Sequence, residues 1–168
     1  MTDFTTKNDI NSRRRVTKPI PIPHLDNGKI QPQAVELEEA VLGALMLEKD
    51  ALTNVIDILK SDSFYKESNS RIFGAIERLF TRSEPVDILT VTQELKKTGE
   101  LDLVGGAYYI TQLTNRVASA ANAEFHARIV AQKYIQRELI RISTKTINDA
   151  YEEGSDVFDL LDNAEKNL

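Results

Sequence analysis

One long run of residues near the end of the chain constrains the fold more than any other feature. From about Ala121 to Tyr151 no proline or glycine occurs, and Gly154 follows, so the run predicts a single long helix. Its apolar residues form two rows, Ile135, Leu139 and Ile142 in one and Phe125, Ile129, Ile140, Ile147 and Tyr151 in the other. The rows are rotated by roughly a third of a turn at ~100° per residue. Together they cover about half of the circumference, wider than the ~100° stripe that docks on one core, so we expect two packing partners.

The first expected partner is a final helix. Ser155 or Asp156 is placed to cap it, and Val157, Leu160, Leu161 and Ala164 follow at helical spacing. The loop between the two helices is short, so we expect residues 119–168 to form an antiparallel helical hairpin. The second partner is either the preceding part of the chain or another subunit. The apolar pattern still runs at Leu168, which is typical of a piece of a longer protein.

Residues 32–118 predict a compact bundle of about five helices, so the expected fold class is all-α. Pro32 suits the first position of the first helix, Asp50 the N-cap of the second, and either Asp87 or Thr90 the N-cap of the fourth. The third helix is expected from about Ser68, and Gly105-Gly106 precedes the fifth. The residues expected to face inward are Ala34, Leu37, Val41, Ala44, Leu45, Leu52, Val55, Ile56, Leu59, Ile72, Phe73, Ile76, Leu79, Phe80, Ile88, Val91, Leu95, Tyr109, Ile110 and Leu113.

The N-terminal residues 1–31 differ from the rest in charge and composition. They hold six basic groups against three acids, including Arg13, Arg14, Arg15 and Lys18, and they carry Pro19, Pro21 and Pro23. Such a segment is expected to be a disordered tail. The chain has a net charge of −5, so −5 − 3 leaves −8 for residues 32–168. An acidic body disfavours broad contact with nucleic acid and favours a protein-binding module.

Catalytic, metal and cofactor signals are weak throughout. No cysteine is present, and the Gly105-Gly106 pair lacks the Lys-Ser/Thr of a phosphate-binding loop. Neither His24 nor His126 has a second ligand-type residue at a spacing specific to a metal site, Glu124 being the nearest to His126. Glu36, Glu38 and Glu39 are typical of a helix N-terminus. We expect no catalytic residue and no cofactor in this chain. Of Tyr108 and Tyr109, one is expected in the core and the other as an exposed hot spot. With no ~20-residue apolar run and no apolar signal region, the expected location is the cytoplasm.

Short blocks of sequence resemble one family in their order and spacing. The resemblance is to the N-terminal domain of the bacterial replicative DNA helicase, the DnaB family, and it covers about residues 32–168. Leu37 departs from it, since the family often has alanine there, and the tail falls outside it. The blocks are Glu36 to Leu45, Phe64-Tyr65, Arg71 to Ile76, Pro85 to Val91, Gly105 to Ile110, Ala121 to Glu124, Ala127 to Val130, Arg137 to Ile140 and Leu160 to Glu165.

This resemblance implies a globular helical part and a hairpin that form the collar of a hexameric ring, built as a trimer of dimers. It implies docking of primase through its helicase-binding domain, for which the expected contacts are Glu36, Tyr109, Arg137 and Ile140. A helicase loader is a further expected partner. The family places ATP, Mg²⁺ and DNA translocation in a C-terminal RecA-like domain that these residues do not include. The expected oligomer interface is Phe125, Ile129, Ile140, Ile147 and Tyr151.

Two other functions compete with this interpretation. The helicase-binding domain of primase itself shares the architecture of a helical bundle with a hairpin. The block Asp87 to Val91, followed by Gly105-Gly106, favours the helicase. A stand-alone helical DNA-binding domain is the second alternative, and the acidic body argues against it.

Overall fold

The computed structural model describes residues 29–117, 120–152, 154 and 156–167. They form seven α-helices and two short 3-10 turns, and no strand occurs within these ranges. The predicted all-α fold is confirmed. The expected disorder of the tail, the boundary near residue 118 and the capping role of Ser155 fall on residues outside the described ranges. The elements are α1 Val35–Leu47, α2 Lys49–Val55, η1 Ser61–Ser63, α3 Glu67–Thr81, α4 Ile88–Lys97, α5 Gly106–Asn115, η2 Ala120–Asn122, α6 Ala123–Tyr151 and α7 Val157–Asn167.

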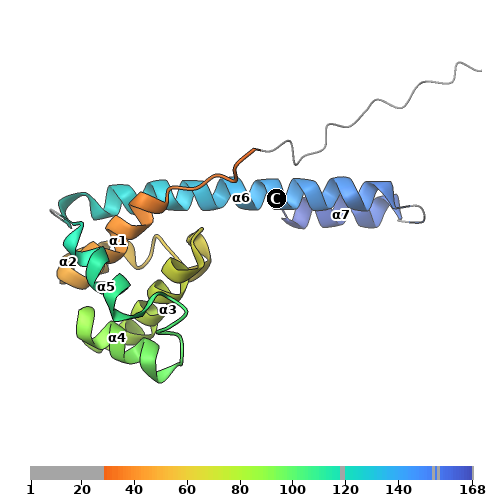
Figure 1. Ribbon diagram of the computed structural model, residues 1–168. Helices are drawn as coiled ribbons and strands as arrows, with labels where there is room; N and C mark the ends of the chain where they lie inside the picture. The colour runs from red at the N-terminus through yellow and green to blue at the C-terminus, as the bar shows by residue number, and fades with distance from the viewer. Residues whose placement is uncertain (1–28, 118–119, 153, 155, 168) are drawn as a thin grey trace, which may run out of the picture.

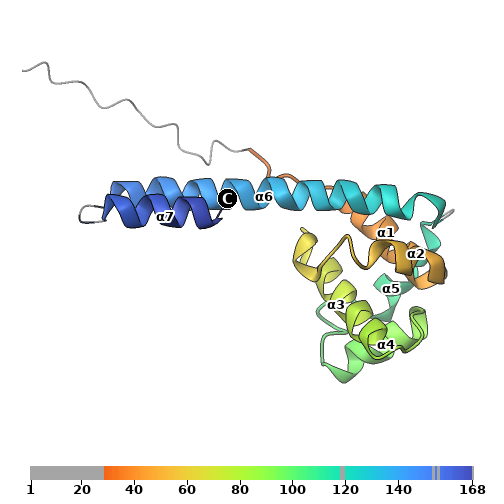
Figure 2. The ribbon, with the colours of Figure 1, turned by 180° about the vertical axis from the view of Figure 1, so that it is seen from behind.

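The molecule has a globular part and a projecting hairpin. Helices α1 to α5 gather on one side of the N-terminal half of α6 (Figure 1). The C-terminal half of α6 extends away from them, and α7 folds back along it in the antiparallel direction (Figures 1 and 2). The bundle of five helices followed by a hairpin matches the prediction. Among the described helices, none is long and apolar enough to cross a membrane.

Helix α1 lies at the centre of the globular core. Its Val41 and Leu42 are fully buried, and the helix packs against both α5 and α6. Gly43 permits the approach of α5, because a Cβ there would lie 2.3 Å from the Leu113 carbonyl oxygen and 2.5 Å from Val117 Cγ2. No side chain larger than hydrogen fits at that position without moving a backbone. The sequence placed Gly43 in a helix without indicating this contact.

Helix termini in the α3–α5 region follow ordinary capping chemistry. The carboxylate of Asp87 accepts hydrogen bonds from the backbone amides of Leu89 (2.8 Å) and Thr90 (2.9 Å). Asp87 is therefore the N-cap of α4, and the alternative at Thr90 is excluded. Gly99 ends the helix with φ +74°, the left-handed conformation that glycine adopts most readily. Gly105, with φ +100°, is the left-handed joint before α5, where a side chain would be strained.

Three sequence expectations are corrected by the structure. Phe80 was expected in the core, but 41% of it is exposed, because it lies in the last turn of α3, beyond Leu79, the last buried residue of that helix. Asp50 was expected to cap α2, but it lies in the first turn, and Glu48 occupies the N-cap without a side-chain hydrogen bond. Pro32 was expected at the first position of the first helix, but α1 begins at Val35, with Ala34 as its N-cap.

Candidate oligomerisation and docking surfaces

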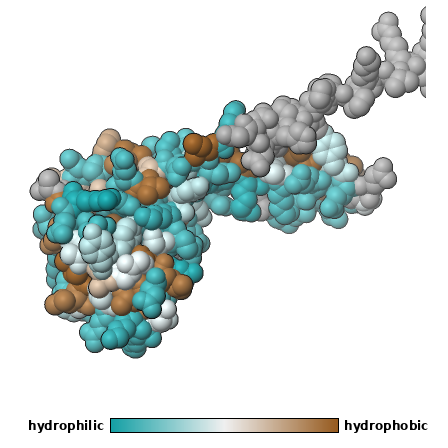
Figure 3. Space-filling model, viewed as in Figure 1, coloured by the Kyte–Doolittle hydropathy of each residue, from teal (hydrophilic) through white to brown (hydrophobic). Residues whose placement is uncertain are grey.

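The hairpin carries a large amount of exposed apolar surface. Of the 29 residues of α6, only Ala123, Ala127 and Val130 are buried, and all three lie in its N-terminal part. Figure 3 shows apolar side chains at the surface of the hairpin as well as over the globular part. We call the exposed apolar residues of these two helices the hairpin surface. They are Phe125, Ile135, Leu139, Ile140, Tyr151, Val157, Phe158 and Leu161.

The five residues expected at an oligomer interface all lie outside the core. Phe125 is 65% exposed, Ile140 36% and Tyr151 62%, while Ile129 and Ile147 are half-buried. At ~100° per residue the five fall within roughly a quarter of the helix circumference. The structure therefore gathers them on one face of α6, where they are available for a partner.

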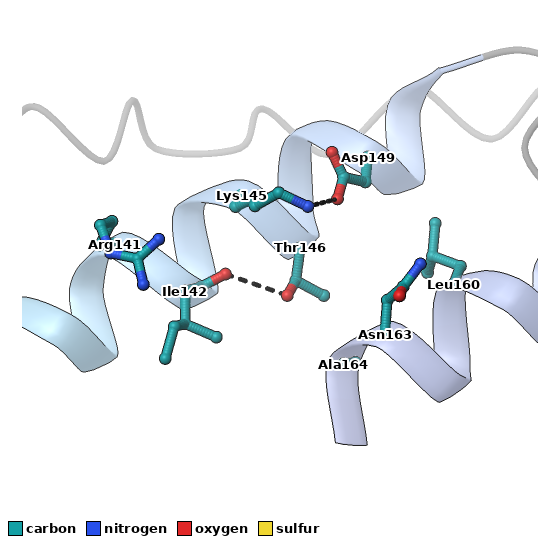
Figure 4. Close-up of a pocket in the computed structure, with 8 residues that line it drawn as sticks. All are labelled: Arg141, Ile142, Lys145, Thr146, Asp149, Leu160, Asn163 and Ala164. Atoms are coloured by element: carbon teal, nitrogen blue, oxygen red, sulfur yellow. Dashed lines mark hydrogen bonds and ion pairs between the residues drawn. The ribbon is translucent and has the colours of Figure 1, made fainter. Parts of the chain in front are cut away.

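Contact between α6 and α7 is narrow. Figure 4 shows Ile142, Thr146 and their neighbours on α6 facing Leu160 and Ala164 on α7. Leu160 and Ala164 are half-buried, whereas the other described side chains of α7 are exposed. Asp156 accepts a hydrogen bond from the Phe158 amide (2.8 Å), so it caps α7 as predicted. The α7 residues that approach α6 are therefore few, and its Val157, Phe158 and Leu161 stay exposed.

Arg137 ties the middle of α6 to the globular part. Its guanidinium donates to the carbonyl oxygens of Pro32 (2.9 Å) and Ser63 (2.8 Å). It also lies over the rings of Tyr65 (5.6 Å) and Tyr134 (5.8 Å), within the range of a cation–π interaction. The arginine thus sets the direction in which the hairpin leaves the globular part.

Tyr109 stands in a polar network that joins α1, α3 and α5. Its hydroxyl lies within hydrogen-bond distance of Glu39 (3.0 Å), Asn69 (2.7 Å) and Lys66 (2.7 Å), and Arg116 also donates to Glu39. Burial raises the pKa of Tyr109, assisted by Glu39. Burial alone would raise the pKa of Glu39, but the bonds from Lys66 and Tyr109 outweigh it and hold that pKa below its usual value. Tyr108, in contrast, is 74% exposed, as expected for one of the pair, whereas Tyr109 is half-buried against the core and not within it.

Glu38 is a structural carboxylate that sequence reasoning missed. It accepts hydrogen bonds from the backbone amides of Tyr65 (2.7 Å) and Lys66 (3.3 Å) and from the Asn69 side chain (3.0 Å). These donors lie at the start of α3, so Glu38 caps that helix from α1. A signal for it existed, because positions 38, 41, 42 and 45 lie on one helical stripe and the other three are apolar and buried.

A second set of charges ties α3 to α4. The Glu94 carboxylate is buried and accepts from Arg78 (3.0 Å) and Arg82 (2.7 Å), while Glu100 accepts from Arg78 (2.9 Å) and Arg71 (3.2 Å). The hydrogen bond from Arg82 is the main reason that the pKa of Glu94 is lowered. These carboxylates therefore hold helices together.

The four expected primase contacts are spread over three helices. Glu36 is exposed on the first turn of α1. Arg137 and Ile140 lie one turn apart on α6, and Tyr109 lies on α5 beside Glu39. Two of the four are engaged within the domain, since Arg137 and Tyr109 make the bonds described above. Glu36 and Ile140 present exposed surface.

Metal-binding clusters are not found in the part of the chain that the structure describes, where no group of three or more His, Cys, Asp or Glu side chains converges. His126 packs near the ring of Phe125, with centroids 6.3 Å apart. His24 lies outside the described residues.

These features define the class of protein: an all-helical domain that consists of a globular part and a hairpin with an exposed apolar surface. A family model described as "DnaB-like helicase N terminal domain" matches residues 30–132. The chain belongs to that family. The match agrees with the helicase interpretation of the sequence over the primase and DNA-binding alternatives.

Known relatives agree with this assignment. The chain is 46% identical over 155 residues to the replicative DNA helicase DnaB of Rhodothermus marinus, an alignment of 92% of this chain and 16% of that protein. It is 45% identical over 142 residues to the replicative DNA helicase DnaC of Bacillus subtilis, covering 84% of this chain and 31% of that protein. The chain thus spans less than a third of the length of either relative.

A solved structure supports the fold assignment. The crystal structure of the N-terminal domain of DnaB helicase from Mycobacterium tuberculosis superposes with a TM-score of 0.78 at 37% sequence identity. The superposition covers 82% of this chain and 97% of that one. The arrangement of globular part and hairpin is therefore shared with a member of the family.

Proposed function

We propose that this chain is the collar domain of a hexameric replicative helicase, with two tasks: to assemble subunits and to dock primase. Family membership and the exposed hairpin surface support the first task. Apolar side chains as exposed as Phe158 (78%) and Val157 (68%) bring a solubility cost that a partner subunit removes. In this proposal, hairpins of two subunits pair, and three such pairs close the ring.

In this proposal the parent protein unwinds duplex DNA with ATP and Mg²⁺ held by a separate C-terminal domain. The collar domain positions the subunits and primase and takes no part in ATP hydrolysis. Its acidic body keeps DNA from binding broadly to its outer face. The parent ring works in the bacterial cytoplasm at the replication fork, where a helicase loader is a further partner.

Primase docking is proposed at the junction of the globular part and the hairpin. Glu36 supplies an exposed charge and Ile140 an apolar contact for primase. Arg137 and Tyr109 act indirectly, because their bonds within the domain fix the shape of the surface to which primase binds. The observation that carries this choice is the Arg137 clamp on Pro32 and Ser63, because it holds the start of α1 beside α6. A partner at that place contacts both parts of the domain at once.

Calorimetric titration with the helicase-binding domain of primase tests the docking proposal. Glu36→Lys reverses an exposed charge, and we expect about tenfold weaker binding with unchanged helical content. Asp102→Lys is the matched control, because Asp102 is exposed on the loop between α4 and α5, far along the chain from the junction. Equal loss of affinity in both variants, or no binding by the unmodified chain, would contradict the proposal.

A further inference from the structure

An open groove lies on the globular part, away from the junction and the hairpin. It has a volume of ≈ 660 Å³ and runs between the α1–α2 turn, the end of α3 and the loop before α4. Its apolar lining includes Met46, Leu47, Phe80, Pro85 and Val86. We call it the α2–α3 groove. Leu47 is 51% exposed and Phe80 41%, so large apolar side chains line it without a covering group from the described chain.

One wall of the groove is held by backbone geometry. After α3, the Glu84 amide donates to the Leu79 carbonyl (2.9 Å) and the Ser83 amide to the Phe80 carbonyl (2.9 Å). This is a helix C-terminal motif in which the residue at φ +56° is Ser83, where glycine is the usual choice. The turn directs Pro85 and Val86 along the groove. The groove therefore has a defined wall, and Phe80, which the helical pattern had placed in the core, lies in it.

Charges around the groove favour a basic occupant. The two segments that form it, residues 46–53 and 83–87, hold four acids (Glu48, Asp50, Glu84 and Asp87) and one lysine, and with the Arg82 that pairs with Glu84 the balance is −4 + 2 = −2. The nearby Arg82 is already paired with Glu84 (2.9 Å) and with Glu94 (2.7 Å). A segment with apolar residues next to basic ones matches both the apolar lining of the groove and the negative charge around it.

We propose that the α2–α3 groove binds the basic, proline-rich segment of this chain, residues 13–25. This inference goes beyond the collar function and does not depend on it. The segment has Ile20 and Ile22 between prolines, and in a polyproline-type backbone, with three residues per turn, their side chains project about 120° apart and can contact two walls of the groove. Arg13, Arg14, Arg15 and Lys18 precede them. Prolines at alternate positions lower the entropy lost when an extended segment is bound.

Chain length limits how far the segment reaches from Lys29. Ile22 lies seven residues before Lys29, a stretch that spans at most about 25 Å when extended. Helix α1, which separates the start of the described chain from the groove, is about 20 Å long. The isoleucines fill the apolar lining, and the arginines lie beside Glu48, Asp50 and Glu84.

Photo-crosslinking in the full-length chain tests the proposal. The probe is Phe80→benzoylphenylalanine, which places the reactive ketone in the groove at an exposed position. Trypsin releases the proposed occupant as one peptide, Val16 to Lys29, since a Lys-Pro bond is not cleaved. We expect mass spectrometry to find that peptide attached at position 80. The matched control is Leu89→benzoylphenylalanine, a 79% exposed position outside the groove, from which we expect no such product.

Variants of the segment give the quantitative arm. Ile20→Ser combined with Ile22→Ser is expected to lower the crosslink yield about tenfold, whereas Ile10→Ser, in the same tail but outside the segment, leaves it unchanged. A mixture of heavy- and light-isotope chains distinguishes a crosslink within one chain from a crosslink between two chains, because only the latter joins a heavy to a light peptide. Either product supports the proposal. Attachment of position 80 to any other peptide, or a yield indifferent to Ile20 and Ile22, overturns it.

Discussion

The globular part buries its apolar side chains within its own core, whereas the hairpin leaves many of its apolar side chains exposed. In the globular part, α1 alone buries residues Val41, Leu42, Ala44, Leu45 and Met46 to 4% exposure or less. In the hairpin, no described residue of α7 is buried and the last buried residue of α6 is Val130. The first region is stabilised by its own core. The second retains exposed apolar surface, which in the proposed function is buried by a second chain.

The largest expected effect comes from the globular core. Phe73 is fully buried and packs on Phe64 with ring centroids 4.9 Å apart, so Phe73→Ala should lower the free energy of unfolding by about 3–5 kcal/mol. Phe158→Ala is the comparison in the hairpin. At 78% exposure it should change the stability of the monomer by less than about 0.5 kcal/mol. Urea denaturation of both variants below the association concentration checks the pair, and equal losses would contradict the contrast.

Removal of the buried cap comes next. Glu38→Ala leaves the Tyr65 and Lys66 amides and the Asn69 side chain without their acceptor, and we expect a loss of about 1–3 kcal/mol. Glu36→Ala, two residues earlier and exposed, should change the free energy of unfolding by less than about 0.5 kcal/mol. Thermal unfolding followed by circular dichroism compares them. A Glu38→Ala variant as stable as Glu36→Ala would show that the α1–α3 cap contributes little.

Acid should destabilise the globular part. The pKa values of Glu39, Glu94 and Glu100 all lie below their usual value near 4.5 in the folded chain. A carboxyl with a lowered pKa in the folded state contributes stability above its unfolded pKa, and that stability is lost as the pH falls through the folded value. We therefore expect the unfolding temperature to be level above about pH 5 and to fall below it.

Glu94→Gln provides the control for this pH dependence, because it removes one of the titrating groups. Its unfolding temperature should be lower than that of the wild type at neutral pH and should fall less steeply in acid. A variant with the same slope as the wild type would mean that Glu94 takes no part in the acid response.

Much of this contrast could be predicted from the sequence. Apolar spacing found the seven helices, because a helix that buries one face must repeat its apolar residues every three or four positions. The same rule misplaced Phe80, one residue beyond a buried position, because spacing alone does not say where a stripe ends. The long helix was expected to hold two apolar rows, and its surface does carry Ile135, Leu139 and Ile140.

The polar contacts could not be predicted in the same way. The Lys66–Tyr109 contact joins residues 43 apart in the chain, and the Arg137–Pro32 bond joins residues 105 apart. No local pattern encodes such distances. Tyr109 and Arg137 were therefore expected as partner contacts from the family resemblance, and the structure engages both within the domain. Their role toward primase stays a prediction.

The smallest expected effect concerns the turn after α3. Ser83→Gly relieves a left-handed conformation (φ +56°) and should stabilise the globular part by roughly 0.5–1 kcal/mol. Gly99→Ala is the opposite substitution, which adds a side chain at a left-handed position, because Gly99 has φ +74° and open space around its missing Cβ. It should destabilise by a similar amount through backbone strain alone. Urea midpoints that move in the same direction for both variants would contradict this account.

Sedimentation velocity of the full chain over a concentration series tests the central claim, that the hairpin surface exists to be covered by another copy. We predict a dimer or a larger assembly for the wild type, and a monomer with unchanged helical content for Ile140→Asp combined with Ile147→Asp. Leu89→Asp combined with Leu103→Asp, exposed apolar positions of the globular part at 79% and 65%, should leave the assembly intact. A wild type that sediments as a monomer throughout, or an Ile140/Ile147 variant that stays assembled, would contradict the account.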